Sequence, residues 1–323
     1  MIPKEGSLMP DMKKYTILTE EQNLALIRRL RKPEGRIDVV MDTDTYNEID
    51  DQFALSYLVR SDEKADVKAI YAAPFYNSNS VGPEDGMLKS YDEILHLLTL
   101  LGREDLKDSV YRGSEDYLPD EETPQDSDAA RDLAARAMQY TTEKPLYVVA
   151  TGAITNVASA ILMRPEIIDR IVVVWLGGTA IHWPHNREFN LMQDIAAARI
   201  IFGCGVPLVQ LPCAGVVSAF TISGPELVYH LKGRNALCDY LASYTIQEAE
   251  KASPYSTWTR AIWDVTAVGW LLDGPFMEDK LIHSPIPEYD DRYAFDDRRH
   301  FIRYVYHINR DALMEDLFAK LRK

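Results

Sequence analysis

Residues 37–51 read IDVVMDTDTYNEIDD, an apolar run that passes directly into a cluster of acidic side chains. The run is continuous rather than alternating, which is typical of a strand that helices cover on both faces. In an open parallel sheet, the carboxyl ends of the strands form the crevice in which ligands bind. We therefore predict a first strand at Ile37–Asp42, a helix that starts near Asp50, and functional chemistry at the edge between them.

Short β-branched runs alternate with longer amphipathic stretches along the rest of the chain. This alternation predicts an α/β fold with an open, mostly parallel central sheet and helices on both faces. The further predicted strands are Val67–Ala72, Leu146–Ala150, Ile171–Leu176, Val206–Leu211 and Arg299–Ile308, and the last predicted helix is Ala312–Leu321. Polar or glycine-rich clusters follow four of these strands, at residues 44–51, 77–79, 151–152 and 177–178. We expect these clusters to meet at one edge of the sheet.

The first part of the chain precedes the first predicted strand. Thr19 and Gln22 form a Thr-x-x-Gln capping-box pattern, and apolar residues then recur at helical spacing. No repeat or Gly/Ser-rich linker divides the remainder. We expect residues 1–34 to be a helical extension and residues 35–323 to be a single α/β domain.

The composition excludes several classes of protein. With 35 Lys and Arg against 50 Asp and Glu, the 323 residues carry a net charge of −15, which disfavours binding to nucleic acid. The longest apolar run, Ile171–Leu176, is far shorter than a membrane helix, so we expect no membrane partner. Residues 1–16 lack the pattern of a secretory signal, and we expect a cytoplasmic protein. Three cysteines without a Cys-x-x-Cys pair indicate neither a disulfide framework nor a zinc site.

Five carboxylates fall within ten residues around the end of the first strand: Asp42, Asp44, Glu48, Asp50 and Asp51. Like charges that converge on one loop raise each other's pKa values unless a cation lies among them. A hard divalent metal suits such a cluster of oxygens, and both calcium and magnesium fit this pattern. A structural alternative is that Asp50 and Asp51 cap the following helix while the other acids are solvated.

The motifs around these acids resemble those of a known family. Asp-x-Asp, a short turn and Asp-Asp after the first strand resemble the fingerprint of the inosine-uridine-preferring nucleoside hydrolases. Three further elements resemble that family in the same order: Thr151-Gly-Ala-Ile-Thr-Asn156, Glu188-Phe-Asn190 with Asp194, and Trp263-Asp264 where a His-Asp pair is usual. The resemblance extends over roughly residues 36–318 and implies a Rossmann-related fold.

The resemblance also implies an activity and a set of site residues. It implies calcium-dependent hydrolysis of the N-glycosidic bond of a ribonucleoside, or of a related N-riboside, into ribose and free base. The implied calcium ligands are Asp44, Asp51, Asp264 and the backbone carbonyl of Thr151. The implied contacts to ribose hydroxyls are Asp50, Asn77, Glu188 and Asn190, with Asn79 as an alternative to Asn77 and Asp42 as a supporting carboxylate. Asp44 is also the implied base, and a homodimer or homotetramer is the implied assembly.

The chemistry of these residue types agrees with such a reaction. Cleavage of an N-glycosidic bond builds oxocarbenium charge on the ribose, and nearby carboxylates stabilise that charge. A calcium ion at the sugar hydroxyls would hold and acidify the attacking water, and Asp44 would accept its proton. The amides of Asn77 and Asn190 offer both donors and acceptors to a diol.

Two features depart from the family pattern. The turn between the second and third aspartates of the motif contains five residues, two more than usual, so Glu48 or Asn47 could join the site. Trp263 replaces a histidine that protonates the leaving base in many members, and an indole is not an acid near neutral pH. Either another group protonates the base, or Trp263 stacks on it, or the leaving group needs no acid. The structural alternative is that Trp263 packs in the core. His182, in the loop after the strand that ends at residue 176, is a further candidate ligand contact.

Two other functions are compatible with the sequence. A family member with an altered loop and no histidine could bind a metal and a ribose-containing ligand without turnover. A phosphatase of the haloacid-dehalogenase type also carries Asp-x-Asp after its first strand, but Tyr46 stands where that class usually has Thr or Val. Release of ribose from a nucleoside separates these functions.

Overall fold

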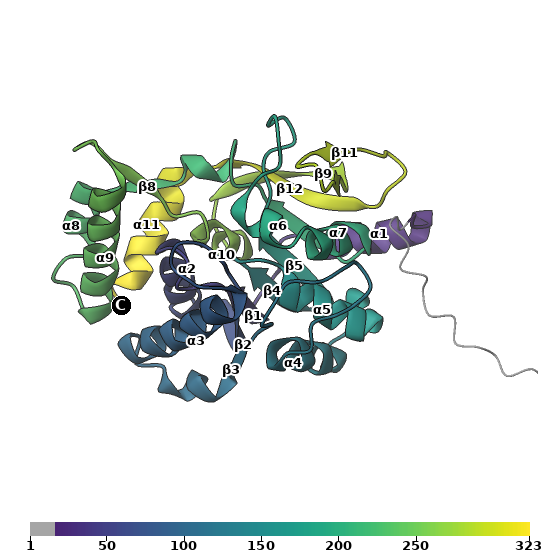
Figure 1. Ribbon diagram of the computed structural model, residues 1–323, viewed down its shortest axis with the longest axis horizontal. Helices are drawn as coiled ribbons and strands as arrows, with labels where there is room; N and C mark the ends of the chain where they lie inside the picture. Colours follow the sequence, from purple (N-terminus) through teal and green to yellow (C-terminus); the bar gives the residue numbers. More distant parts are fainter. Residues whose placement is uncertain (1–16) are drawn as a thin grey trace, which may run out of the picture.

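Figure 1 shows the computed structural model of the chain, which describes residues 17–323. Residues 1–16, where we expected no secretory signal, lie outside the described residues. Across the described part, no helix is both long and apolar enough to cross a membrane.

An eight-stranded sheet forms the centre of the molecule, in the order β3-β2-β1-β4-β5-β6-β12-β9. All neighbouring strands in it are parallel except β12 and β9, which are antiparallel. Its strands are β1 (Ile37–Thr43), β2 (Ala65–Ala72), β3 (Val110–Arg112), β4 (Leu146–Ala150), β5 (Ile171–Leu176), β6 (Leu208–Leu211), β9 (Met277–His283) and β12 (Phe301–Ile308). The predicted open, mostly parallel α/β fold is confirmed.

Helices cover both faces of this sheet (Figure 1). One core cluster contains side chains from α1 (Glu20–Arg29), α2 (Asp50–Val59), α3 (Pro83–Leu100), α8 (Gly224–His230), α9 (Ala236–Ala252), α10 (Val265–Leu271) and α11 (Arg310–Leu321). The second cluster contains side chains from α4 (Asp128–Arg136), α5 (Thr155–Met163), α6 (Phe189–Gln193) and α7 (Ile195–Gly203). Successive side chains of a strand point to opposite faces, so Val39 and Met41 enter the first core while Val40 enters the second.

Helix α1 begins at the predicted capping box. Thr19 Oγ1 accepts a hydrogen bond from the backbone N–H of Gln22, and the Gln22 side chain accepts one from the backbone N–H of Thr19. Leu26 within the helix and Leu30 at its end are fully buried. The helix therefore contributes apolar surface to the core rather than standing apart from it.

The chain order of the sheet reverses beside β1, because β1 pairs with β2 on one side and with β4 on the other. At such a point the following loops diverge and leave a crevice. Two small antiparallel sheets contact the loops at this edge, β7 (Thr221–Ser223) with β8 (Thr259–Ala261) and β10 (Ile286–Pro287) with β11 (Tyr293–Ala294). Arg260 of β8 donates a hydrogen bond to Glu48, and the Tyr293 hydroxyl of β11 accepts one from the backbone N–H of Thr179. Several of the side chains predicted from the sequence to be functional lie around this crevice, among them Asp50, Asp51 and Asp264.

Candidate metal and ligand site

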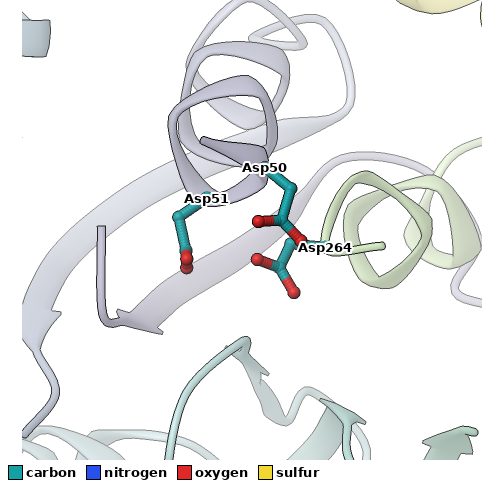
Figure 2. Close-up of side chains that lie close together, drawn as sticks. All are labelled: Asp50, Asp51 and Asp264. Atoms are coloured by element: carbon teal, nitrogen blue, oxygen red, sulfur yellow. The ribbon is translucent and has the colours of Figure 1, made fainter. Parts of the chain in front are cut away.

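Three buried aspartates meet at this reversal of the sheet, as Figure 2 shows. Asp50 and Asp51 occupy the first turn of α2, and Asp264 directly precedes α10, which packs against α2. Carboxylate oxygens from the three residues lie within 4.8 Å of one another. Their side chains are buried, with exposed fractions of 3%, 1% and 2%. The fold thus brings an aspartate from late in the chain next to a pair from its beginning.

Two threonines hold the side chain of Asp51. Its Oδ1 accepts hydrogen bonds from Thr43 Oγ1 at 2.5 Å and from Thr151 Oγ1 at 2.8 Å. Thr43 ends β1, and Thr151 directly follows β4. Because β1 and β4 are the two strands beside the crevice, the sheet itself fixes the orientation of this carboxylate.

Asp44 adjoins the same cluster from the loop after β1. It is fully buried, and neither of its carboxylate oxygens accepts a hydrogen bond from the described residues. Burial raises the pKa of Asp44 well above its ordinary value, and the carboxylates of Asp51 and Asp50 raise it further. Burial likewise raises the pKa of Asp264, followed by the charges of Asp50, Asp51 and Asp44. A cation among these oxygens would favour the ionised form of all of these carboxylates.

Asp42 lies within β1 and faces a different partner. Its Oδ1 accepts a hydrogen bond from Asn156 Nδ2 at 2.8 Å, whereas its Oδ2 has no donor among residues 17–323. Asn156 Oδ1 in turn accepts from the backbone N–H and the hydroxyl of Ser114, both at 2.8 Å. Burial raises the pKa of Asp42 to about 7, although the bond from Asn156 opposes this rise.

A cavity of about 270 Å³ opens beside the aspartate cluster. Its lining residues are Asn47, Glu48, Asp50, Asp51, Thr151, Leu176, Arg187, Glu188, Phe189, Asn190, Cys213, Ala214, Trp263 and Asp264. The lining thus includes both acidic and apolar or aromatic side chains. This combination suits a small molecule with one polar and one flat apolar part.

Glu188 and Asn190 enter the cavity from the start of α6. Glu188 caps this helix, because its carboxylate accepts the backbone N–H groups of Asn190 and Leu191 at 3.0 Å and of Gly178 at 2.7 Å. Burial raises the pKa of Glu188 to about 7, and these N–H groups oppose the rise. Asn190 Nδ2 donates to the carbonyl oxygen of Thr151 at 2.8 Å. A carbonyl oxygen has two lone pairs, so that of Thr151 can still bind a second partner.

Two of the predicted ligand contacts do not line the cavity. Asn77 Nδ2 donates to Asn47 Oδ1, and Asn79 Nδ2 donates to the Asn47 carbonyl at 2.9 Å. Asn47 itself lines the cavity, so both asparagines hold the lengthened loop from outside. His182 has an exposed side chain in the loop after β5. Direct contact of Asn77 or His182 with a ligand stays a prediction.

Arg260 was not singled out from the sequence, yet it joins the two departures from the family pattern. Its Nη2 donates to Glu48 Oε2 at 2.6 Å, and its guanidinium carbon lies 5.7 Å from the centroid of the Trp263 ring. Burial raises the pKa of Glu48 to about 7, Asp50 adds to this rise, and Arg260 opposes it. Only the position of Arg260, three residues before Trp263, could have drawn attention to it. Arg187, another cavity residue, was also missed.

A family model described as inosine-uridine preferring nucleoside hydrolase matches residues 39–314. A pyrimidine-specific ribonucleoside hydrolase from Citrobacter koseri is 30% identical over 196 residues, which are 54% of this chain and 59% of that protein. The chain therefore matches less than two thirds of the length of this curated relative.

Two solved structures share the fold across nearly their whole length. A plant nucleoside hydrolase has a TM-score of 0.72 and 19% identity, with 90% of this chain and 99% of that chain covered. A purine-preferring ribonucleoside hydrolase from Gardnerella vaginalis has a TM-score of 0.72 and 20% identity, with 88% of this chain and 98% of that chain covered.

Proposed function

The chain belongs to the inosine-uridine preferring nucleoside hydrolase family, and we propose that it hydrolyses the N-glycosidic bond of a ribonucleoside or a related N-riboside. The products would be ribose and a free base. One observation carries this proposal, namely the meeting of Asp50, Asp51 and Asp264 beside a cavity of small-molecule size. Buried carboxylates there would stabilise the oxocarbenium charge that develops on the ribose.

The residues of the cluster fit a hard divalent cation, and we propose that the cation is calcium. The donors are all oxygen atoms, which calcium prefers, and both oxygens of Asp44 are buried without a hydrogen-bond donor among the described residues. The proposed protein ligands are Asp44, Asp51, Asp264 and the carbonyl of Thr151. When bound, calcium supplies positive charge that binds sugar hydroxyls and lowers the pKa of the attacking water.

The side chains of the site divide the remaining work between them. Asp44 would accept the proton of the attacking water, because its oxygens have no protein donor to satisfy them. Asp50, Glu188 and Asn190 line the cavity and would bind the ribose hydroxyls. Trp263 also lines the cavity and would stack on the leaving base. Asp42 would support the loop that carries Asp44.

Measurement of free ribose tests the proposal directly. The purified protein would be incubated with calcium and a panel of ribonucleosides, and we expect release of ribose from at least one of them. Asp44→Asn should lower kcat by about 10²- to 10⁴-fold, the usual contribution of a general base. Asp62→Asn is the matched control, because Asp62 is exposed and lies outside the cavity.

The result also separates the second candidate function. Calcium and ribose binding without release of ribose from any nucleoside would contradict the proposed hydrolysis. That outcome would indicate a ribose-binding protein that lacks turnover, consistent with the tryptophan at position 263. Hydrolysis of a phosphate ester that depends on magnesium and Asp42 would instead favour the phosphatase.

Assembly and location stay predictions. The family resemblance implies a homodimer or homotetramer, and light scattering of the purified protein measures this directly. Cytoplasmic location is predicted from the sequence and is tested by fractionation of the source cells.

A further inference from the structure

We propose that Glu48 selects the leaving base by accepting a hydrogen bond from an amino group of that base, and that Arg260 positions Glu48 and Trp263 for this contact. This inference rests on the proposed hydrolysis and names a preferred substrate class. Amino-substituted bases, as in adenosine and cytidine, should be preferred to their oxo counterparts in inosine and uridine.

Glu48 has one carboxylate oxygen committed and one available. Its Oε2 accepts from Arg260 Nη2 at 2.6 Å, and the structure records no donor to Oε1 among residues 17–323. The side chain is 39% exposed and is one of the residues that line the cavity. The ion pair with Arg260 favours the ionised form of Glu48, and an ionised carboxylate only accepts hydrogen bonds. The available oxygen therefore suits an N–H group of a ligand.

Glu48 and Trp263 both contact the guanidinium of Arg260. This guanidinium forms the ion pair with Glu48 and lies 5.7 Å from the centroid of the Trp263 ring, within the range of a cation–π contact. Glu48 and Trp263 both line the cavity. A flat base bound against Trp263 would therefore share the cavity with Glu48.

The loop that carries Glu48 is held from its other side. Asn77 and Asn79 both donate hydrogen bonds to Asn47, the residue before Glu48. A carboxylate on a loop that is already fixed loses less conformational entropy when a ligand binds. It therefore discriminates between ligands better than a mobile carboxylate. An oxo oxygen in place of the amino group would face the carboxylate oxygen of Glu48. Both atoms are hydrogen-bond acceptors, so neither would have a donor.

Matched substrate pairs test this inference. We would measure kcat/KM for adenosine against inosine and for cytidine against uridine, in the calcium-loaded protein and in Glu48→Gln. The unsubstituted protein should favour the amino member of a pair. Because the charged acceptor is replaced by a neutral amide that can also donate to an oxo group, Glu48→Gln should reduce that preference by about tenfold.

Glu288→Gln is the matched control. Glu288 is also 39% exposed and is also paired with an arginine, Arg199, at 3.2 Å, but it does not line the cavity. Glu288→Gln should leave the preference for amino-substituted bases unchanged. The exchanged pair Glu48→Arg with Arg260→Glu restores opposite charges but removes the acceptor from position 48. A purely structural ion pair would be rescued by the exchange, whereas the base preference should not return.

Inhibition by free ribose shows whether the sugar site is intact in each variant. Arg260→Lys keeps the charge near Glu48 but loses the planar group beside Trp263, so it should weaken the preference while leaving the ribose inhibition constant unchanged. Equal kcat/KM values within both substrate pairs, or an unchanged preference in Glu48→Gln, would overturn the inference.

If the proposed hydrolysis itself is wrong, no ribose will be released from any nucleoside, which differs from the outcomes above. In that case calorimetry with adenine and hypoxanthine, in the presence of calcium and ribose, still decides the inference. Tighter binding of adenine that is lost in Glu48→Gln would support it, and equal binding of the two bases would refute it.

Discussion

Thr151 shows how one residue serves the candidate site in two ways. Its backbone carbonyl is a proposed calcium ligand, and its hydroxyl donates to Asp51 Oδ1 at 2.8 Å. Thr151→Val keeps the carbonyl and the shape of the side chain but removes the hydroxyl. Because Asp51 then loses one of its two orienting donors, we expect calcium affinity to fall about tenfold, as measured by calorimetry.

Thr155→Val is the control for this substitution. The hydroxyl of Thr155 also donates to a buried aspartate, Asp194 Oδ2 at 2.7 Å, but Asp194 caps α7 and lies outside the cluster. Thr155→Val should lower the stability of the protein without lowering its affinity for calcium. An equal loss of affinity in both variants would show that the Asp51 contact has no special role.

Asn156 is expected to matter for stability. Its Nδ2 donates to Asp42 at 2.8 Å, and its Oδ1 accepts from Ser114. Asn156→Ala leaves a buried carboxylate without its only donor among the described residues, so the free energy of unfolding should fall by about 2 kcal/mol or more. Urea unfolding measures this. Ser114→Ala removes one hydroxyl donor to Asn156 and should lower the free energy of unfolding by less than Asn156→Ala does. A larger loss in Ser114→Ala would contradict this interpretation.

At the scale of elements, the strands that were predicted share one physical property. Six strands were found within two residues at each end, and most are buried on both faces, as in β4 and β5. Strand β9 was missed because it lies at the sheet edge and includes charged, partly exposed residues. Strands β7 and β8 have three residues each, too few for a periodic pattern to show.

The candidate site was predictable only where its residues lie in recognisable motifs. Asp50, Asp51 and Asp264 lie in such motifs, and the fold brings them together. Arg260 lies in β8, and its contact with Glu48 depends on how that short strand packs against a distant loop. No local pattern encodes such a contact. Asn77 was predicted near the ribose, but its bond to Asn47 depends on the conformation of the lengthened loop.

The packing of α2 against α10 gives a prediction for metal removal. Asp50 and Asp51 begin α2, and Asp264 precedes α10, so a bound cation would link the two helices. Calcium at 100 times its Kd should stabilise the folded chain by about 2.7 kcal/mol, which corresponds to a rise in Tm of about 4 °C. Thermal unfolding with calcium and with a chelator measures this.

Asp264→Asn tests the same link. The variant removes one negative charge from a crowded buried cluster, so it should be no less stable than the unsubstituted protein when calcium is absent. The rise in Tm on calcium addition should be strongly reduced. An undiminished rise would mean that the cation binds elsewhere.

At the scale of the whole molecule, the net charge of −15 attracts cations but exerts no such attraction on a neutral substrate. The long-range field of the protein attracts calcium toward the cluster, and salt screens that field over distances of about 10 Å at 0.1 M. A ribonucleoside without phosphate carries no charge, so the same field neither attracts nor repels it. Salt should therefore affect the two binding events differently.

We expect the Kd for calcium to rise roughly three- to tenfold between low salt and about 0.3 M sodium chloride, because the field that gathers the cation is screened. At saturating calcium, KM for a ribonucleoside should stay the same over this range. Calcium titrations and steady-state kinetics at the two salt concentrations measure both quantities. A parallel rise in Kd and KM would indicate instead that salt perturbs the cavity itself. A salt-independent Kd would mean that the buried carboxylates alone, without the rest of the surface, determine the attraction of the cation.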